Sequence, residues 1–470
     1  MQAATLAGGD GGGTSDGGAV GLRGISAKGA NFKDAVLEGG VGGGDGGDVY
    51  LSYGTFDGAS FDGAVIKGGV GGNGGGIYAD SLGFHGASLK GALIQGGSGQ
   101  AYGGKVMAAY ADFGSAKLDG AVIKGGDGGQ DGGTVYLSYS TLDGASLQGA
   151  TLAGGDGATG DGGRVGLDGI SAKDANFKDA VLEGGVGGDD GGSVYLSYGE
   201  LDGASFDGAI IEGGNGINGT GGQVDMPYVS LRATTLEGVL IQGGDGVSGG
   251  GAVNMDEPQM DHANFKDAVI KGGDARDGDG GNVQMSYGSQ VGTSFEGATI
   301  QAGDADRTGK GGYVGFSGSS LKGATFKNAI LKAGNGQNSS DYDYGSTVFF
   351  SGAEMDGANL DGADIEGGNN PFSSGGVKFS YASLDKASLV GAHIKGGDGA
   401  TEDGGSVGFP SASMKEVRLD GAVIKGGDGA IAGGNVIFTK AELRGTDLQT
   451  ADIQGGVGGS SNGGVVGLGA

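Results

Sequence analysis

Large apolar residues recur at every fifth position along this chain. In one stretch they are Leu137, Leu142, Leu147 and Leu152. Two residues before each stands a small or branched residue: Val135, Ser140, Ala145 and Ala150. A period of five fits neither the 3.6-residue period of a helix nor the two-residue alternation of a strand. It fits a chain that turns a corner every five residues and points positions i−2 and i inward, so four such sides predict a square coil.

A longer period runs through the whole chain. A glycine-rich tract followed by a valine recurs from Val20 to Val466, with Ile77 in the third place, and these residues are spaced by 28 to 31 positions except for 34 between Val314 and Val348. A fixed period of this length is typical of a solenoid, in which each repeat packs on its neighbours. We therefore predict one continuous all-β, right-handed β-solenoid over residues 1–470, with about 16 coils of 29–30 residues.

The glycine tracts have a period of their own. Residues 68–76 read as three-residue units that begin with a glycine pair. Three residues per turn is the period of a polyproline-II-type helix, which polyglycine can adopt because it has no Cβ. Such helices have no internal hydrogen bonds, but tracts stacked at the ~4.8 Å spacing of a β-ladder could bond to one another. We predict that each coil consists of four pentads and one stacked, polyglycine-II-like segment, rather than a disordered surface loop.

Near-identical stretches indicate an internal duplication. Residues 24–40 return almost letter for letter at residues 169–185, which is a shift of five coils. We therefore predict that a five-coil block, residues 1–145, was duplicated at residues 146–290. After about residue 220 one core position changes from Leu to Met (Met226, Met255 and Met285) and then to Phe, so that like residues still follow one another.

The pentads resemble the unit Ala-(Asp/Asn)-Leu-X-X of pentapeptide-repeat proteins. Close matches occupy residues 30–34, 175–179 and 358–362. The resemblance implies a right-handed quadrilateral β-helix with Leu or Phe stacked in the core and Ala tucked at the corners. The glycine-rich insert in every coil departs from that family, whose pentads run without interruption.

Composition and charge narrow the functional classes. The chain has 122 glycines, 4 prolines and no cysteine among 470 residues, which excludes collagen, disulfides and thiolate metal sites. A net charge of −28 disfavours direct binding to nucleic acid or to anionic membranes. No apolar run approaches the ~20 residues of a membrane span. The start of the chain shows no secretory signal, yet we favour an extracellular or cell-surface location for such a protein.

Acids in the glycine tracts are candidate calcium ligands, because calcium prefers oxygen donors. The candidates are Asp45, Asp127, Asp131, Asp156, Asp161, Asp189 and Asp190. The tracts resemble the Gly-Gly-X-Gly-X-Asp nonapeptide of secreted β-rolls, but Gln130 stands where an Asp is required. Turn chemistry and solubility explain these acids as well, so calcium is the alternative interpretation.

Tyrosine and histidine are two further candidates for a functional role. Tyrosines follow the repeat valine by four positions in seven coils, as at Tyr53, and would cover the surface or bind a glycan or protein. His85, His262 and His393 occupy three different repeat positions and share no common set of acid partners. With no Ser-His-Asp arrangement and no cysteine nucleophile, we predict no catalytic or cofactor-binding residues and a protein that is not an enzyme.

The two ends of the chain read as incomplete coils. Residues 2–9 match the late part of a coil, and residues 464–468 stop just after a coil has begun. Uncapped ends can pair head to tail between molecules, which builds filaments. The alternatives are that the chain is a segment of a longer protein or that local folding blunts its ends. We therefore predict a rigid, acidic, self-associating filament subunit, surface fibre or adhesin stalk. The alternative is a binding module: an acidic DNA mimic of pentapeptide-repeat type, or an ice- or calcium-binding surface protein.

Overall fold

The computed structural model describes residues 2–337, 346–372 and 374–468. The chain divides into two compact units, unit 1 of Met1–Thr235 with Gly244–Gly246 and unit 2 of Leu236–Gly243 with Val247–Ala470. Both are parallel β-solenoids, and the described residues contain no helix, hence none that could cross a lipid bilayer. The predicted all-β solenoid with about 16 turns is confirmed. The single continuous domain and the five-coil duplication stay predictions.

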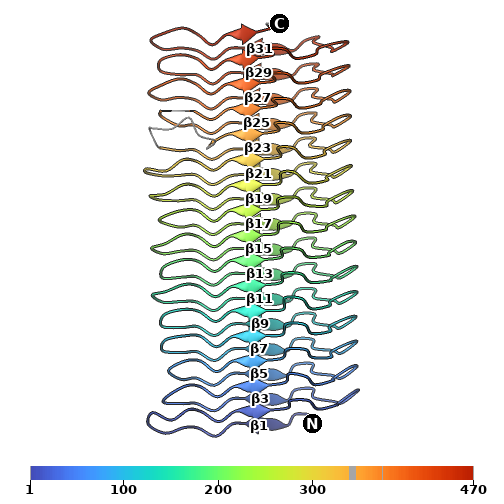
Figure 1. The fold of residues 1–470 in the computed structure, drawn as a ribbon, viewed down its shortest axis with the longest axis vertical. Helices are drawn as coiled ribbons and strands as arrows, with labels where there is room; N and C mark the ends of the chain where they lie inside the picture. The colour runs from blue at the N-terminus through green and yellow to red at the C-terminus, as the bar shows by residue number, and fades with distance from the viewer. Residues whose placement is uncertain (1, 338–345, 373, 469–470) are drawn as a thin grey trace. The chain divides into compact units, whose positions relative to one another are not determined.

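Unit 1 contains strands of three residues and strands of two residues, which alternate along the chain (Figure 1). The three-residue strands are β1 (Thr5–Ala7), β3 (Val36–Glu38), β5 (Val65–Lys67), β7 (Leu93–Gln95), β9 (Val122–Lys124), β11 (Thr151–Ala153), β13 (Val181–Glu183) and β15 (Ile210–Glu212). The two-residue strands are β2 (Val20–Gly21), β4 (Val49–Tyr50), β6 (Ile77–Tyr78), β8 (Val106–Met107), β10 (Val135–Tyr136), β12 (Val165–Gly166), β14 (Val194–Tyr195) and β16 (Val224–Asp225).

Unit 2 repeats the same alternation. Its three-residue strands are β17 (Leu240–Gln242), β19 (Val269–Lys271), β21 (Thr299–Gln301), β23 (Ile330–Lys332), β25 (Asp364–Glu366), β27 (His393–Lys395), β29 (Val423–Lys425) and β31 (Asp452–Gln454). Its two-residue strands are β18 (Val253–Asn254), β20 (Val283–Gln284), β22 (Val314–Gly315), β24 (Val348–Phe349), β26 (Val377–Lys378), β28 (Val407–Gly408), β30 (Val436–Ile437) and β32 (Val466–Gly467).

Within each unit, strands of the same length pair in parallel from one coil to the next. In unit 1, β9 pairs with β11 so that Ile123 lies opposite Leu152. In unit 2, β27 pairs with β29 so that Ile394 lies opposite Ile424. Equivalent repeat positions therefore lie side by side, and side chains form ladders whose neighbours stabilise one another.

Sharp corners connect the sides of each coil. In the coil that begins at Val135, Tyr139, Gly144 and Gly149 have φ values of 61°, 62° and 62°. Glycine adopts this left-handed conformation without strain, whereas a residue with a side chain such as Tyr139 does so at a cost of roughly 1–2 kcal/mol. The amide of Ala145 donates to the carbonyl of Leu142 at 2.9 Å and closes its turn. Three corners of the coil thus contain a residue in the same left-handed conformation, and the glycine segment takes the place of the fourth corner.

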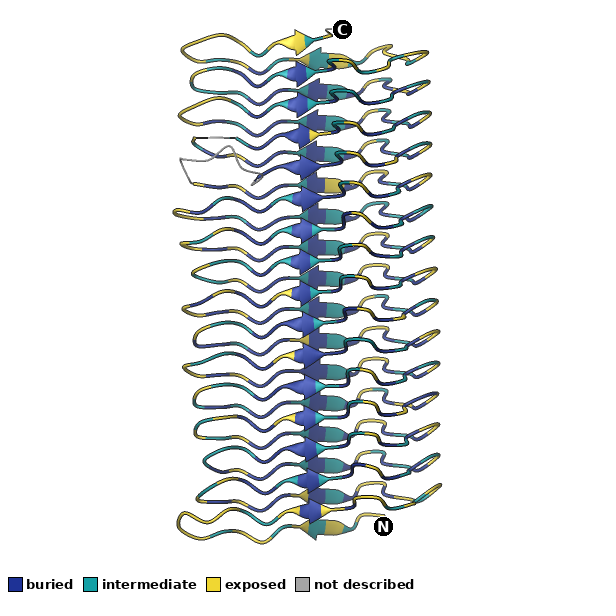
Figure 2. Cartoon of the chain, in the orientation of Figure 1, coloured by how far each residue is buried: buried dark blue, intermediate teal, exposed yellow. Residues whose placement is uncertain are grey.

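The core confirms the inward positions predicted from the period of five. Leu137, Leu142, Leu147 and Leu152 are all at most 1% exposed. Figure 2 shows the buried residues along the strands and yellow, exposed residues at the loop tips. Ser140 also faces inward, where its hydroxyl donates to the carbonyl of Ala108 at 2.8 Å and accepts from the amide of Ala111 at 3.0 Å. A polar group is tolerated here because both of its hydrogen-bonding functions are used.

In unit 2 one core position carries a stack of phenylalanine rings. Successive rings are nearly parallel, tilted by 2–5°, with centroids 4.8–5.3 Å apart: Phe316, Phe350, Phe379, Phe409 and Phe438. The in-register pairing of β22, β24, β26, β28 and β30 brings the rings into this stack. The change of this position to Phe therefore keeps like residues in contact, as the sequence predicted.

The glycine segments are ordered by hydrogen bonds that run alternately between coils and within a coil. In unit 1 the amide of Gly126 donates to Gly104 of the preceding coil at 2.8 Å, and Gly133 donates to Gly126 of its own coil at 2.7 Å. Gly155 of the next coil then donates to Gly133 at 2.8 Å. We call this alternating series the glycine zigzag. Its presence confirms the predicted stacking of the glycine segments.

Candidate functional site

The acids of the glycine segments stand in two columns and hold the next coil by its backbone. The acids of the first column follow the first glycine pair of their segments. This column includes Asp127, which follows residues 125–126 and whose Oδ1 accepts the amide of Asp156 at 3.0 Å. The acids of the second column precede the second glycine pair. This column includes Asp131, which precedes residues 132–133 and accepts the amide of Asp161 at 3.0 Å. The other predicted ligands that accept such amides are Asp45 from Asn73, Asp156 from Val186, Asp161 from Asp190, and Asp190 from Thr220. Asp189 lies exposed beside the second column.

These acids therefore have a hydrogen-bonding role that the sequence did not reveal. Calcium takes six to eight oxygen ligands, and none of the seven predicted aspartates belongs to the group of three close metal-ligating side chains found in the described part of the chain. Calcium binding at these aspartates stays a prediction.

One member of the first column, Asp428, makes a contribution to stability that depends on pH. Its Oδ1 accepts the amide of Val457 at 2.8 Å and lies 3.1 Å from Nζ of Lys425. The amide hydrogen bond, together with Lys425 and Lys395 and against the effect of partial burial, lowers the pKa of Asp428. A carboxyl whose folded pKa is lowered stabilises the fold above its unfolded pKa of about 3.9 and loses this contribution as pH falls through the folded value.

We expect Asp428→Asn to lower the free energy of unfolding by about 0.5 kcal/mol at pH 7, because the amide oxygen keeps the acceptor but loses the charge. Asn335 and Asn369 already fill this position elsewhere in unit 2 and accept the next amide. The variant should also lose less stability than the natural chain between pH 5 and pH 2, as measured by urea unfolding. Asp428→Ala, which lacks charge and acceptor, should be weaker still at pH 7. Equal acid sensitivity of Asp428→Asn and the natural chain would contradict this assignment.

Four of the seven corner tyrosines pack on the surface in two stacked pairs. Tyr110 stacks on Tyr139 with centroids 5.2 Å apart, and Tyr198 stacks on Tyr228 at 4.9 Å. All four have positive φ values and exposed side chains. The ring of Tyr139 also lies over Gly169 of the next coil, where a Cβ would come within 2.8 Å of it. This packing favours the structural interpretation of these tyrosines.

Unit 1 carries a groove that the sequence analysis missed. The groove has a volume of about 530 Å³ and is lined by Tyr78, Tyr102, Tyr136, Lys105, Arg164 and Asp131, among others. Burial, with Asp48 and Asp80 nearby, raises the pKa of Tyr78. Tyr78 and Tyr136 directly follow the repeat Ile77 and Val135, and aligning the coils would have revealed this outward-facing position. The groove combines aromatic rings with charges of both signs.

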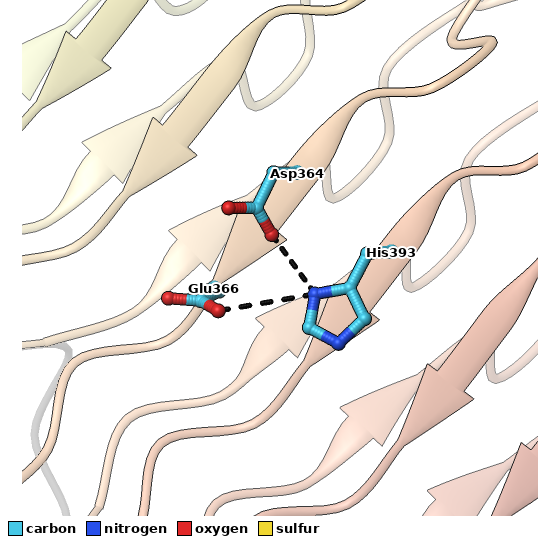
Figure 3. A group of neighbouring side chains, drawn as sticks. All are labelled: Asp364, Glu366 and His393. Atoms are coloured by element: carbon cyan, nitrogen blue, oxygen red, sulfur yellow. Dashed lines mark hydrogen bonds and ion pairs between the residues drawn. The ribbon is translucent and has the colours of Figure 1, made fainter.

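A cluster of Asp364, Glu366 and His393 lies on two neighbouring strands of unit 2 (Figure 3). Asp364 and Glu366 are the first and last residues of β25, and the register places His393 of β27 opposite Asp364. Nδ1 of His393 is 2.9 Å from Oδ1 of Asp364 and 3.8 Å from Oε1 of Glu366. One ligand atom from each residue lies within 4.8 Å of the others, so the group could hold a metal ion.

A lysine from the preceding strand neutralises part of the cluster. Nζ of Lys332 on β23 lies 3.2 Å from Oδ2 of Asp364 and 3.0 Å from Oε2 of Glu366. Burial opposes the charge of Lys332, but the two ion pairs prevail and raise its pKa. This cluster could not be recognised from the repeat positions of the three histidines, which differ from one another. The usable signal was the spacing of 29 residues between Asp364 and His393, which is one coil.

The pentad sides and parallel in-register ladders define a β-solenoid that resembles pentapeptide-repeat proteins. No family model matches the chain. No curated protein matches its sequence. Among solved structures, the chain is similar to HetL, a pentapeptide repeat protein involved in heterocyst differentiation regulation from the cyanobacterium Nostoc sp. strain PCC 7120, with 14% identity, a TM-score of 0.18, and coverage of 79% of this chain and 90% of HetL.

Two further solved structures show similarity at the same level. Full-length QnrB1, a plasmid-mediated fluoroquinolone resistance protein, matches with 14% identity and a TM-score of 0.17, covering 54% of this chain and 91% of that protein. The A-module of the Azotobacter vinelandii mannuronan C-5 epimerase AlgE4 matches with 14% identity and a TM-score of 0.31, covering 81% and 88% respectively. At identities of 14% and TM-scores of 0.17 to 0.31, none of these similarities indicates a function for this chain.

Proposed function

We propose that this protein is a non-enzymatic structural solenoid whose coils stack from one molecule onto the next, as in a filament or surface fibre. The observation that carries the proposal is the in-register hydrogen bonding of each coil to its neighbour through pentad amides, glycine amides and aspartate carboxylates. Ile424 in the interior is buried, whereas the equivalent Ile453 of β31 is half-buried and Leu448 is 45% exposed. Exposed apolar side chains of this kind are suited to contact with another molecule.

Contact between two different surfaces gives an open filament when the rotation between neighbouring molecules does not close, and a ring when it does.

A structural role is also supported by how the described residues are used. Pentad amides, alternate hydrogen bonds of the glycine zigzag and the aspartate columns bond to the neighbouring coil. Hydrogen-bonding groups of each coil thus serve to hold the next coil in place. We infer that holding coils together is the main task of the sequence, and that no catalysis is required of it.

We expect the purified protein to form larger assemblies as its concentration rises. Leu448→Lys should prevent this assembly, because it places a charge at an exposed apolar position. Sedimentation velocity from 1 to 100 µM and negative-stain electron microscopy would measure the assembly. The matched control is Ile330→Lys, the same change at a side chain that is 37% exposed on the first position of β23, away from the last coil. A natural chain that stays monomeric throughout, or equal assembly of Leu448→Lys and the natural chain, would overturn the proposal.

A further inference from the structure

The first position of the three-residue strands carries titratable residues at two places in unit 2, on β25 with β27 and on β31. The first residues of these strands are Leu240, Val269, Thr299, Ile330, Asp364, His393, Val423 and Asp452. β-Branched and aliphatic residues suit this half-buried position. Asp364 and His393 replace them in two successive coils, and β25–β27 pairing places the two side chains in adjacent coils about 4.8 Å apart.

We propose that Asp364, Glu366 and His393 form a binding site for a first-row divalent transition-metal ion, with Zn²⁺ as its probe. The donor set is one imidazole nitrogen and two carboxylate oxygens, a combination that zinc accepts. Ligands bound to zinc at about 2.1 Å in a tetrahedron lie about 3.4 Å apart. The separations from Nδ1 of His393, 2.9 Å to Asp364 and 3.8 Å to Glu366, bracket that value.

The geometry also favours a transition metal over calcium. Calcium prefers six to eight oxygen ligands, whereas imidazole is a common ligand of zinc and its neighbours. Asp364 and Glu366 have side chains that are 32% exposed, and His393 is 41% exposed, so water can complete the coordination. A binding ion would take the place that the Lys332 ammonium shares between the two carboxylates, and the long lysine side chain can turn to solvent.

Such an ion would join two coils. Asp364 and Glu366 belong to one coil and His393 to the next, so the coordinate bonds would cross the same boundary as the β25–β27 hydrogen bonds. The site does not depend on the assembly proposed above, because all three ligands come from the same unit of one chain.

The test is isothermal titration of the full chain with ZnCl₂, followed by histidine side-chain NMR. The chain has three histidines and no cysteine, which leaves few competing nitrogen or sulfur ligands for zinc. We expect one saturable site, a shift of the His393 Nδ1 resonance on binding, and at least a tenfold loss of affinity in His393→Ala and Asp364→Asn. The matched control is His85→Ala, because His85 lies 3.7 Å from a single carboxylate, that of Asp112, and its loss should leave zinc binding unchanged.

Three results would overturn the metal site. They are the absence of saturable binding at 100 µM ZnCl₂, unchanged binding in His393→Ala, and loss of binding in His85→Ala. Asp364→Asn preserves the size of the side chain, and circular dichroism of each variant would show that the fold is retained. Displacement of zinc by millimolar CaCl₂ would contradict the assignment to a transition metal.

Discussion

Gly155→Ala is expected to destabilise unit 1 by about 3 kcal/mol, from overpacking together with the loss of hydrogen bonds. A Cβ at residue 155 would lie 1.9 Å from the carbonyl oxygen of Gly126, and backbone cannot move aside as a flexible side chain can. Gly155 also donates to Gly133 and accepts from Gly163, each at 2.8 Å. Any shift that relieves the clash therefore breaks the glycine zigzag on both sides.

The glycine is required at this position by close approach of neighbouring backbone rather than by a left-handed conformation. The matched control is Gly12→Ala, in a glycine segment of the same kind, where a Cβ would meet nothing within 4 Å. That variant should change stability by less than about 0.5 kcal/mol. Hydrogen exchange measured by mass spectrometry would compare local opening, and equal amide protection around Gly155 in the variant and the natural chain would refute the expectation.

Phe379→Ala should have an effect of similar or larger size in unit 2, about 4 kcal/mol. Phe379 is fully buried and stacks on Phe350 at 4.9 Å and on Phe409 at 4.8 Å. Truncation removes two ring contacts and leaves a cavity that the hydrogen-bonded coils on either side cannot close. Urea unfolding followed by circular dichroism, together with hydrogen exchange of β24, β26 and β28, would measure the loss.

Two companion variants separate packing from other effects at this stack. Phe379→Leu keeps most of the apolar volume and should lose less than half as much stability as Phe379→Ala. Phe372→Ala removes a ring that is 39% exposed, and its effect should stay below about 1 kcal/mol. Local opening that spreads no further in Phe379→Ala than in Phe372→Ala would argue against a cooperative phenylalanine stack.

The sequence predicted the coil well because its signals are local and repeated. The five-residue spacing of Leu137, Leu142 and Leu147 reports the inward positions directly, since each side of the coil is only one pentad long. Even Ser140 was placed inward correctly by its position. Glycine spacing predicted the stacked segments because polyglycine has few other ordered conformations in which neighbouring tracts satisfy each other's backbone groups.

The sites were harder to predict because they arise between coils. Asp364 and His393 meet only after β25 and β27 have paired, and the meaning of either residue depends on a neighbour 29 positions away. The amide-binding role of Asp127 likewise requires the register of the next coil. Left-handed φ at Tyr139 was not foreseen, because a bulky residue ordinarily avoids that conformation.

Coil length has a consequence for protein engineering. The repeat valines are 34 residues apart between Val314 and Val348, yet β22 and β24 pair in the same register as the other two-residue strands. Additional residues between β23 and β24 are thus accommodated without altering the ladders on either side. Glycine segments are therefore natural insertion points, and foreign peptides grafted there would be displayed at intervals set by the spacing of β-strands, about 4.8 Å per coil.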